Sequence, residues 1–210
     1  MATPLERIRA ATLELHQQLE TQTYSRALLD GSLPIALYAS FLRALWILHG
    51  ELEQALERAR EPALRAVFDP ASLKRRALLE RDLAYLQVDL EQIDGAAREA
   101  LVLARTLRLG AAREPSQLLG FAYVLEGSQL GGLVQCQALR LRPELQDGGL
   151  SYLAGAGTAT RARFGQFVAR LELALRDDAS VTAAIAGAQA TFAGFACILG
   201  AVAPERIAAP

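Results

Sequence analysis

Apolar residues recur at every third or fourth position through most of the chain, and this spacing limits the possible folds more than any other feature. Directly after Thr3 and Pro4, one such stripe is formed by Leu5, Ile8, Thr12, Leu15 and Leu19. Residues three and four apart share one face of an α-helix. No run of alternating apolar and polar residues bounded by turn residues occurs, so no sheet is expected. The sequence therefore predicts an all-α fold.

Breaks in this pattern divide the chain into successive helices. The stop signals include Asp30 to Pro34, Pro62, Asp69-Pro70, Gly110 and Pro143, followed by Asp177-Asp178. The helices expected between them cover approximately residues 4–29, 35–60, 72–86, 93–109, 115–141, 158–177 and 180–200. No linker or internal repeat separates them, and 210 residues with 52% apolar content suit one compact unit. We therefore expect a single domain over residues 1–210.

The charge balance and the cysteines exclude several classes of protein. Twenty-two basic and 23 acidic residues nearly cancel, which favours neither nucleic acid nor an anionic membrane as a partner. Cys136 and Cys197 form no Cys-x-x-Cys pattern, so neither a disulfide framework nor covalent heme attachment is expected. The charged amphipathic start of the chain lacks the apolar region of a secretory signal. These features indicate a cytoplasmic protein.

One segment, from Ala179 to Pro204, contains no charged residue and exceeds the roughly 20 residues that a membrane-spanning helix requires. Its larger apolar residues nevertheless follow the 3-and-4 spacing of an amphipathic helix, and no Lys/Arg cluster flanks it. We expect a helix buried in the core of the protein.

His16 is one of only two histidines, and it lies at the edge of the apolar stripe of the first expected helix. Glu20 is four residues further on, where its carboxylate can accept a hydrogen bond from Nδ1 and leave Nε2 available as a metal ligand. Arg9 lies along the same edge, two turns earlier. Taken alone, the pattern fits a metal ligand, but it also fits a hydrogen-bonded histidine of the core or surface.

A second unusual segment, Phe121 to Val134, places three glycines in an apolar helix. Each glycine costs about 1 kcal/mol relative to alanine, so Gly127, Gly131 and Gly132 require a compensating gain. Gly120, Gly127 and Gly131 fall on nearly one face, where bare backbone can approach either a flat ligand or another helix. The segment lacks the strand and the Gly-Lys-Ser/Thr of a phosphate-binding loop. Ligand binding and helix packing remain open.

Two sequence patterns together resemble the heme oxygenases that form biliverdin, particularly the bacterial ones. The first is Arg9-Ala-Ala-Thr12 followed by His16-Gln-Gln-Leu-Glu20, and the second is Tyr123-Val-Leu-Glu-Gly-Ser-Gln-Leu-Gly-Gly132. The resemblance implies a helical bundle holding heme b between the first helix and a kinked, glycine-rich distal helix. It also implies cleavage of heme, as substrate and cofactor, to biliverdin, CO and iron. O₂ and electrons from a ferredoxin or flavoprotein reductase would drive the reaction.

The same resemblance assigns individual roles. His16 would ligate the iron from the proximal side, with Glu20 as its hydrogen-bonding partner and Arg9 as the counter-charge for a propionate. Thr12 and Tyr123 would complete the heme site. The distal helix above the iron would be formed by Gly127, Ser128, Gly131 and Gly132. Because Ser128 stands where eukaryotic members carry an aspartate, water would have to relay protons through backbone carbonyls or this hydroxyl.

Other residues receive no role in the reaction. His49 lies within the apolar face of the second expected helix and is expected to be a hydrogen-bonded core residue. Trp46 is assigned to the core or the cavity wall, and the buried thiol of Cys136 is not expected to ligate iron. Relatives often carry a tryptophan where Phe164 stands. The basic residues near it have no assigned propionate contact: Arg161, Arg163 and Arg170.

Two other functions compete with that of a heme oxygenase. A non-heme di-iron site needs several inward-facing carboxylates and Glu-x-x-His pairs, and neither histidine here follows an acid by three residues. A heme-binding or heme-sensing module without turnover is harder to separate, because binding and catalysis would share His16. This non-catalytic module is the alternative that the sequence leaves open.

Overall fold

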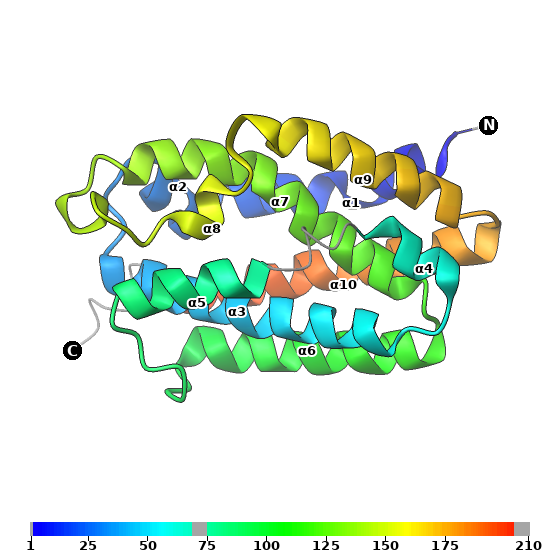
Figure 1. Cartoon of the computed structure of the whole chain (residues 1–210), viewed down its shortest axis with the longest axis horizontal. Helices are drawn as coiled ribbons and strands as arrows, with labels where there is room; N and C mark the ends of the chain where they lie inside the picture. The colour runs from blue at the N-terminus through cyan, green and yellow to red at the C-terminus, as the bar shows by residue number, and fades with distance from the viewer. Residues whose placement is uncertain (1, 69–74, 204–210) are drawn as a thin grey trace.

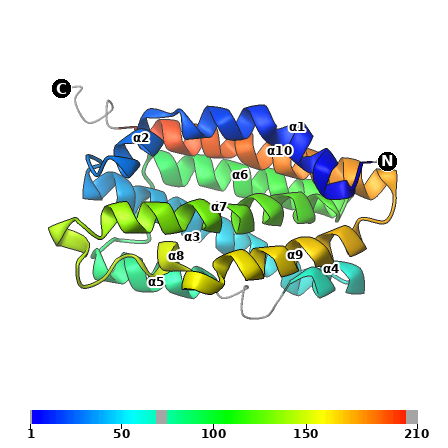
Figure 2. The same ribbon diagram turned by 90° about the horizontal axis from the view of Figure 1, so that it is seen from above.

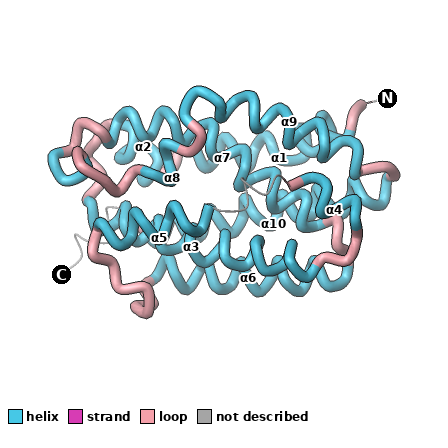
Figure 3. The backbone as a smooth tube through the Cα atoms, viewed as in Figure 1, coloured by secondary structure: helices cyan, strands magenta, loops and turns pink. Residues whose placement is uncertain are grey.

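Every element of regular structure in the described part of the chain, residues 2–68 and 75–203 of a computed structural model, is a helix (Figure 3). The α-helices are α1 (Pro4–Glu20), α2 (Thr23–Leu29), α3 (Ile35–Arg58), α4 (Pro62–Val67), α5 (Arg75–Tyr85), α6 (Gly95–Arg113), α7 (Gln117–Leu139), α8 (Ser151–Ala154), α9 (Thr160–Ala174) and α10 (Asp178–Ala201). Two short 3₁₀ turns, Pro143–Leu145 and Gly157–Ala159, flank α8. The predicted all-α class is confirmed.

The first helix ends nine residues before its expected end at residue 29, and this break creates α2. Gln22 adopts an extended conformation, and the Oγ of Ser25 donates a 2.7 Å hydrogen bond to the carbonyl of Leu19. That bond satisfies a carbonyl at the end of α1 and helps to stabilise the turn. The two β-branched threonines beside Gln22 also have low helix propensity. As a result, α2 can turn toward α7 instead of continuing α1.

Two other boundaries differ from the expectation. The connection around Pro62 contains the short helix α4, which begins with this proline in the first turn, where a missing N–H costs nothing. The expected Asp69-Pro70 break and the expected start of a helix at residue 72 lie outside the described residues. Further along, Asp177 and Ser180 form a reciprocal capping box that starts α10, as the Asp177-Asp178 break predicted.

The long helices run lengthwise through an elongated bundle (Figures 1 and 2). α10 packs against α1, α6 and α7, while α3 packs mainly against α6 and α5. Both α3 and α10 are long and apolar enough to cross a membrane by length and composition, and both pack within the bundle. The prediction of a core helix over the uncharged C-terminal segment agrees with the position of α10.

The helices α7 and α10 meet at glycines. A Cβ on Gly120 would overlap with the carbonyl oxygen of Ala184, and a Cβ on Gly187 would overlap with that of Gln117. The two backbones therefore touch near the start of α7. Beyond this crossing α7 remains one helix through its other glycines. The kink expected in it stays a prediction.

Candidate functional site

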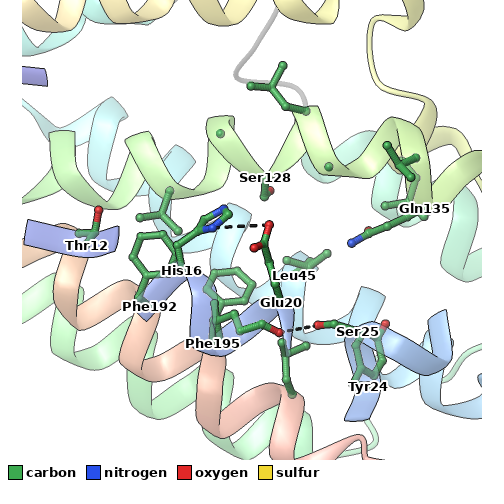
Figure 4. Close-up of a pocket in the computed structure, with 18 of the residues that line it drawn as sticks. Thr12, His16, Glu20, Tyr24, Ser25, Leu45, Ser128, Gln135, Phe192 and Phe195 are labelled. Atoms are coloured by element: carbon green, nitrogen blue, oxygen red, sulfur yellow. Dashed lines mark hydrogen bonds and ion pairs between the residues drawn. The ribbon is translucent and has the colours of Figure 1, made fainter. Parts of the chain in front are cut away.

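A cavity of about 680 Å³ opens between α1, α2, α7 and α10 (Figure 4). This volume lies within the range of roughly 300–1,000 Å³ typical of small-molecule sites. Most of its lining is apolar, including Leu45 of α3, Phe164 of α9, and Phe192 and Phe195 of α10. The few polar side chains come mainly from α1, α2 and α7, so a bound molecule would meet apolar walls and a small set of directed polar groups.

His16 projects from α1 into this cavity. Its Nδ1 lies 3.6 Å from the Oε1 of Glu20, the partner expected from the i, i+4 spacing. The imidazole meets the ring of Phe192 edge-on, with centroids 5.9 Å apart. The Nδ1–Oε1 separation is slightly longer than a hydrogen bond; a small side-chain rotation would let Glu20 accept one from Nδ1 and leave Nε2 for a metal.

The other expected residues of α1 occupy the same wall. Thr12 is buried, and its hydroxyl donates to the carbonyl of Ile8, so the cavity receives mainly its methyl group. Arg9 is exposed at the rim. Among the described lining residues it carries the only guanidinium or ammonium group, while Glu20 carries the only carboxylate.

On the α7 wall, the cavity is bordered by Tyr123, Gly127, Ser128 and Gly131. A Cβ on Gly131 would meet nothing within 4 Å, and one on Gly127 would reach only the ring of Phe164 at 3.7 Å. These glycines are therefore not required by helix packing in the structure as it stands. Gly120, on the same face, is required by it. Helix packing thus accounts for Gly120, whereas ligand binding stays a prediction for Gly127 and Gly131.

Gly132 is the one expected site residue that does not line the cavity. It is buried toward α8, where a Cβ would lie 3.4 Å from the carbonyl oxygen of Leu153. Successive residues on a helix point about 100° apart, and this step turns Gly132 from the cavity face toward α8. Gly132 allows α8 to approach α7.

Sequence reasoning missed Tyr152, which lines the cavity from α8, and Tyr24, Ser25 and Gln135 at the α2 end. Tyr152 lies between two stretches of irregular structure with no apolar periodicity to mark it. Tyr24 and Ser25 were placed on a continuous first helix, which would have carried them away from α7. Among these further lining residues, only Phe192 and Phe195 of α10 could be expected from the sequence to face the interior, because they belong to the apolar stripe of that helix.

His49 is buried, and its Nε2 shares a hydrogen bond of 2.9 Å with the hydroxyl of Tyr152. Burial, together with the nearby positive charge of Arg75, lowers the pKa of His49 from 6.5 to about 3, so its imidazole is neutral at ordinary pH. The prediction of a hydrogen-bonded core histidine is confirmed. His49 does not line the cavity.

The remaining candidates lie elsewhere. Trp46 is half-buried on α3, where its Nε1 donates to Glu80 of α5. Cys136 is buried in the core. None of the three arginines of α9 lines the cavity, and Arg170 donates to the carbonyl of Val67 in α4. The described residues hold no group of three or more His, Cys, Asp or Glu suited to a metal.

A family model described as heme oxygenase matches residues 3–200. The chain belongs to the heme oxygenase family. Heme oxygenase 1 of Gallus gallus is 26% identical over 168 residues, which cover 77% of this chain and 56% of that protein. Heme oxygenase 1 of Bos taurus is 27% identical over 169 residues, covering 77% and 57%. The chain thus spans just over half the length of these curated relatives.

Solved bacterial heme oxygenases share the fold. Heme oxygenase-1 from the cyanobacterium Synechocystis sp. PCC6803, solved in complex with heme, superposes with a TM-score of 0.83 at 20% identity, covering 98% of this chain and 95% of that one. Heme oxygenase from Leptospira interrogans gives a TM-score of 0.79 at 19% identity, covering 96% and 99%. The resemblance and the fold class expected from the sequence are both confirmed.

Proposed function

We propose that the chain is a heme oxygenase that cleaves bound heme to biliverdin, CO and free iron, using O₂ and external electrons. One observation carries the proposal: His16 on α1 and the unobstructed glycine backbone of α7 border the same apolar cavity from facing helices (Figure 4). Membership of a heme-binding family, with neighbours crystallised with heme, supports it.

The residues of the cavity fit a heme. A flat, largely apolar macrocycle needs apolar walls and a close approach of backbone, which Gly127 and Gly131 permit because they have no Cβ. An iron ligand needs a neutral imidazole of fixed orientation, and Glu20 is placed to hold the Nδ1 of His16. A propionate needs a counter-charge at the rim, where Arg9 is exposed.

Each of these residues then has a distinct task in the proposed reaction. His16 would hold the iron through Nε2, and Glu20, beside Nδ1, would orient the imidazole. Bound heme supplies the iron that activates O₂ and the macrocycle that is oxidised. The Oγ of Ser128 donates to the carbonyl of Leu125, which leaves the lone pairs of this oxygen at the cavity wall to accept a hydrogen bond from water. No histidine other than His16 lines the cavity among the described residues.

The test begins with the purified protein and hemin. A Soret band that disappears under oxygen with ascorbate, or with ferredoxin and its reductase, while biliverdin absorbance grows, is the expected result. A Soret band that persists through turnover conditions would favour the non-catalytic heme-binding module. Failure to form a Soret band would overturn both functions.

The ligand assignment has its own test in the two histidines. We expect His16→Ala to abolish the wild-type heme spectrum, because no other described lining residue offers an imidazole. His49→Ala should still form a Soret band, since His49 lies outside the cavity. The reverse pattern would overturn His16 as the ligand.

A further inference from the structure

Tyr152 combines two properties that no other described tyrosine shares. It lines the cavity, and its buried hydroxyl forms a hydrogen bond to a histidine of the core. Tyr38 is equally buried and hydrogen-bonded, to the carbonyl of Gly149, but does not line the cavity. Tyr123 lines the cavity but is only partly buried. A polar group of this kind at an apolar wall is a candidate contact for a ligand.

The hydroxyl of Tyr152 reaches the α7 wall beside Ser128. Ser128 and Gln129 lie near this hydroxyl, and Ser128 borders the cavity. Neither side chain is hydrogen-bonded to it: the Oγ of Ser128 donates to the carbonyl of Leu125, and the buried Oε1 of Gln129 has no partner among the described residues. On its other side the hydroxyl meets the Nε2 of His49 at 2.9 Å, with the two rings edge-on at 5.3 Å between centroids. A line of hydrogen-bonding groups therefore runs from the cavity wall into the core between α3 and α7.

The backbone around Tyr152 is held in place from α5. One carboxylate, that of Asp82, accepts hydrogen bonds from the backbone N–H groups of Ser151 at 2.8 Å and Tyr152 at 2.7 Å. Asp82 is itself fully buried. Two charge-assisted bonds to consecutive N–H groups fix the start of α8, and with it the direction of the tyrosine side chain.

The pair of side chains carries no net charge at ordinary pH. Burial raises the pKa of Tyr152, and burial together with Arg75 lowers that of His49. The charged groups that face the pair are Arg75 and Asp82 of α5 and Glu126 of α7. Across the cavity stand His16 and Glu20 of α1. Both hydroxyl and imidazole can therefore act as neutral donors and acceptors.

We propose that Tyr152 is a polar contact for a water-sized ligand bound on the α7 side of the heme, and that His49 is the positioning residue that aims its hydroxyl there. The inference rests on the proposed heme binding and adds two residues to the site. His49 acts through Tyr152 and touches no ligand itself. Without this hydrogen bond, the direction of the O–H bond and of the hydroxyl lone pairs is no longer fixed from the core side.

The test uses the ferric heme complex of the full chain, whose iron-bound water loses a proton at a pH that absorption spectra report. A single hydrogen bond to that water or its hydroxide is expected to shift the midpoint by about one pH unit, a tenfold change in the proton equilibrium. We therefore expect Tyr152→Phe to move the midpoint by this amount. His49→Leu should move it in the same direction, and His49→Gln, which keeps a hydrogen-bonding side chain, by less.

Tyr38→Phe is the matched control, because it removes one buried hydroxyl that does not face the cavity; its midpoint should equal that of the wild type. A wild-type midpoint in Tyr152→Phe would overturn the contact, and a wild-type midpoint in His49→Leu would overturn the positioning role. If Tyr152→Phe does not unfold cooperatively, a wild-type midpoint in His49→Leu would overturn both the contact and its positioning, and a shifted midpoint would support both. Absence of a Soret band in the wild type would overturn heme binding itself, an outcome distinct from an unshifted midpoint.

Discussion

Gly120 of α7 and Ala184 of α10 bring two helix backbones into direct contact, since a Cβ on Gly120 would overlap with the carbonyl oxygen of Ala184. Neither backbone can move aside without disturbing α10, which also packs against α1 and α6. We expect Gly120→Ala to lower the free energy of unfolding by at least about 2 kcal/mol, in the range for overpacked cores. Urea denaturation of the heme-free protein measures this change.

Gly131→Ala is the matched substitution on the same helix, and its expected effect on stability is opposite. A Cβ there meets nothing within 4 Å, so the higher helix propensity of alanine should raise the free energy of unfolding by about 0.5–1 kcal/mol. Its affinity for hemin should nevertheless fall, because the methyl group occupies the surface that the macrocycle approaches. Unchanged hemin affinity in a folded Gly131→Ala protein would contradict the assignment of this glycine to the heme site.

For these glycines, the sequence predicts which helix face they share but not what lies against that face. Helical projection placed Gly120, Gly127 and Gly131 on one face, and the structure agrees. It could not say that a neighbouring helix covers the first and a cavity the other two, because that depends on where α10 crosses. The pairing of His16 with Glu20 was predictable for the same local reason, since i, i+4 neighbours meet on any helix.

The role of Tyr152 and the existence of α2 could not be predicted from the sequence, because both depend on contacts that the local sequence pattern does not reveal. The hydrogen bond between Tyr152 and His49 joins residues more than a hundred positions apart, and nothing local to either one encodes it. The end of α1 depends on a side-chain bond from Ser25 to the carbonyl of Leu19, without glycine or proline to mark it. Contacts that form only in the folded protein therefore supply the part of the cavity that the sequence pattern left out.

The buried imidazole of His49 predicts a specific pH dependence of stability. In the unfolded chain His49 takes up a proton below about pH 6.5, whereas in the folded protein its pKa is about 3. Between these values the unfolded state binds more protons, so the free energy of unfolding falls as the pH falls, by up to about 1.4 kcal/mol per pH unit from this group. We would measure the free energy of unfolding of wild type and His49→Leu by urea denaturation at pH 7, 6, 5 and 4. The difference between the two proteins isolates the contribution of His49, because all other titratable groups are the same in both.

The stability advantage of the wild type over His49→Leu should shrink steadily from pH 7 to pH 4. A constant difference over that range would show that the imidazole titrates normally in the folded protein. Histidine NMR signals provide an independent check, because the Cε1 proton of His49 should not shift with pH in this window.

The position of Arg9 predicts that its guanidinium pairs with a propionate of bound heme. Its side chain is the only guanidinium or ammonium group among the described lining residues, and it is exposed at the rim. Exposed ion pairs contribute about 0.2–1 kcal/mol, so we expect Arg9→Gln to raise the dissociation constant of hemin by up to about fivefold. Arg7→Gln is the matched control, because Arg7 lies on the same helix but pairs with Asp178, 2.5 Å away, outside the cavity lining.

Fluorescence quenching by hemin and by its dimethyl ester tests the charge directly. If Arg9 pairs with a propionate, the loss of affinity in Arg9→Gln appears for hemin and is absent for the uncharged ester. It should also diminish with added salt, since screening weakens exposed charge pairs. An equal loss for both porphyrins would show that Arg9 contributes by packing, and the propionates would then face solvent without a cationic partner from the described lining of the cavity.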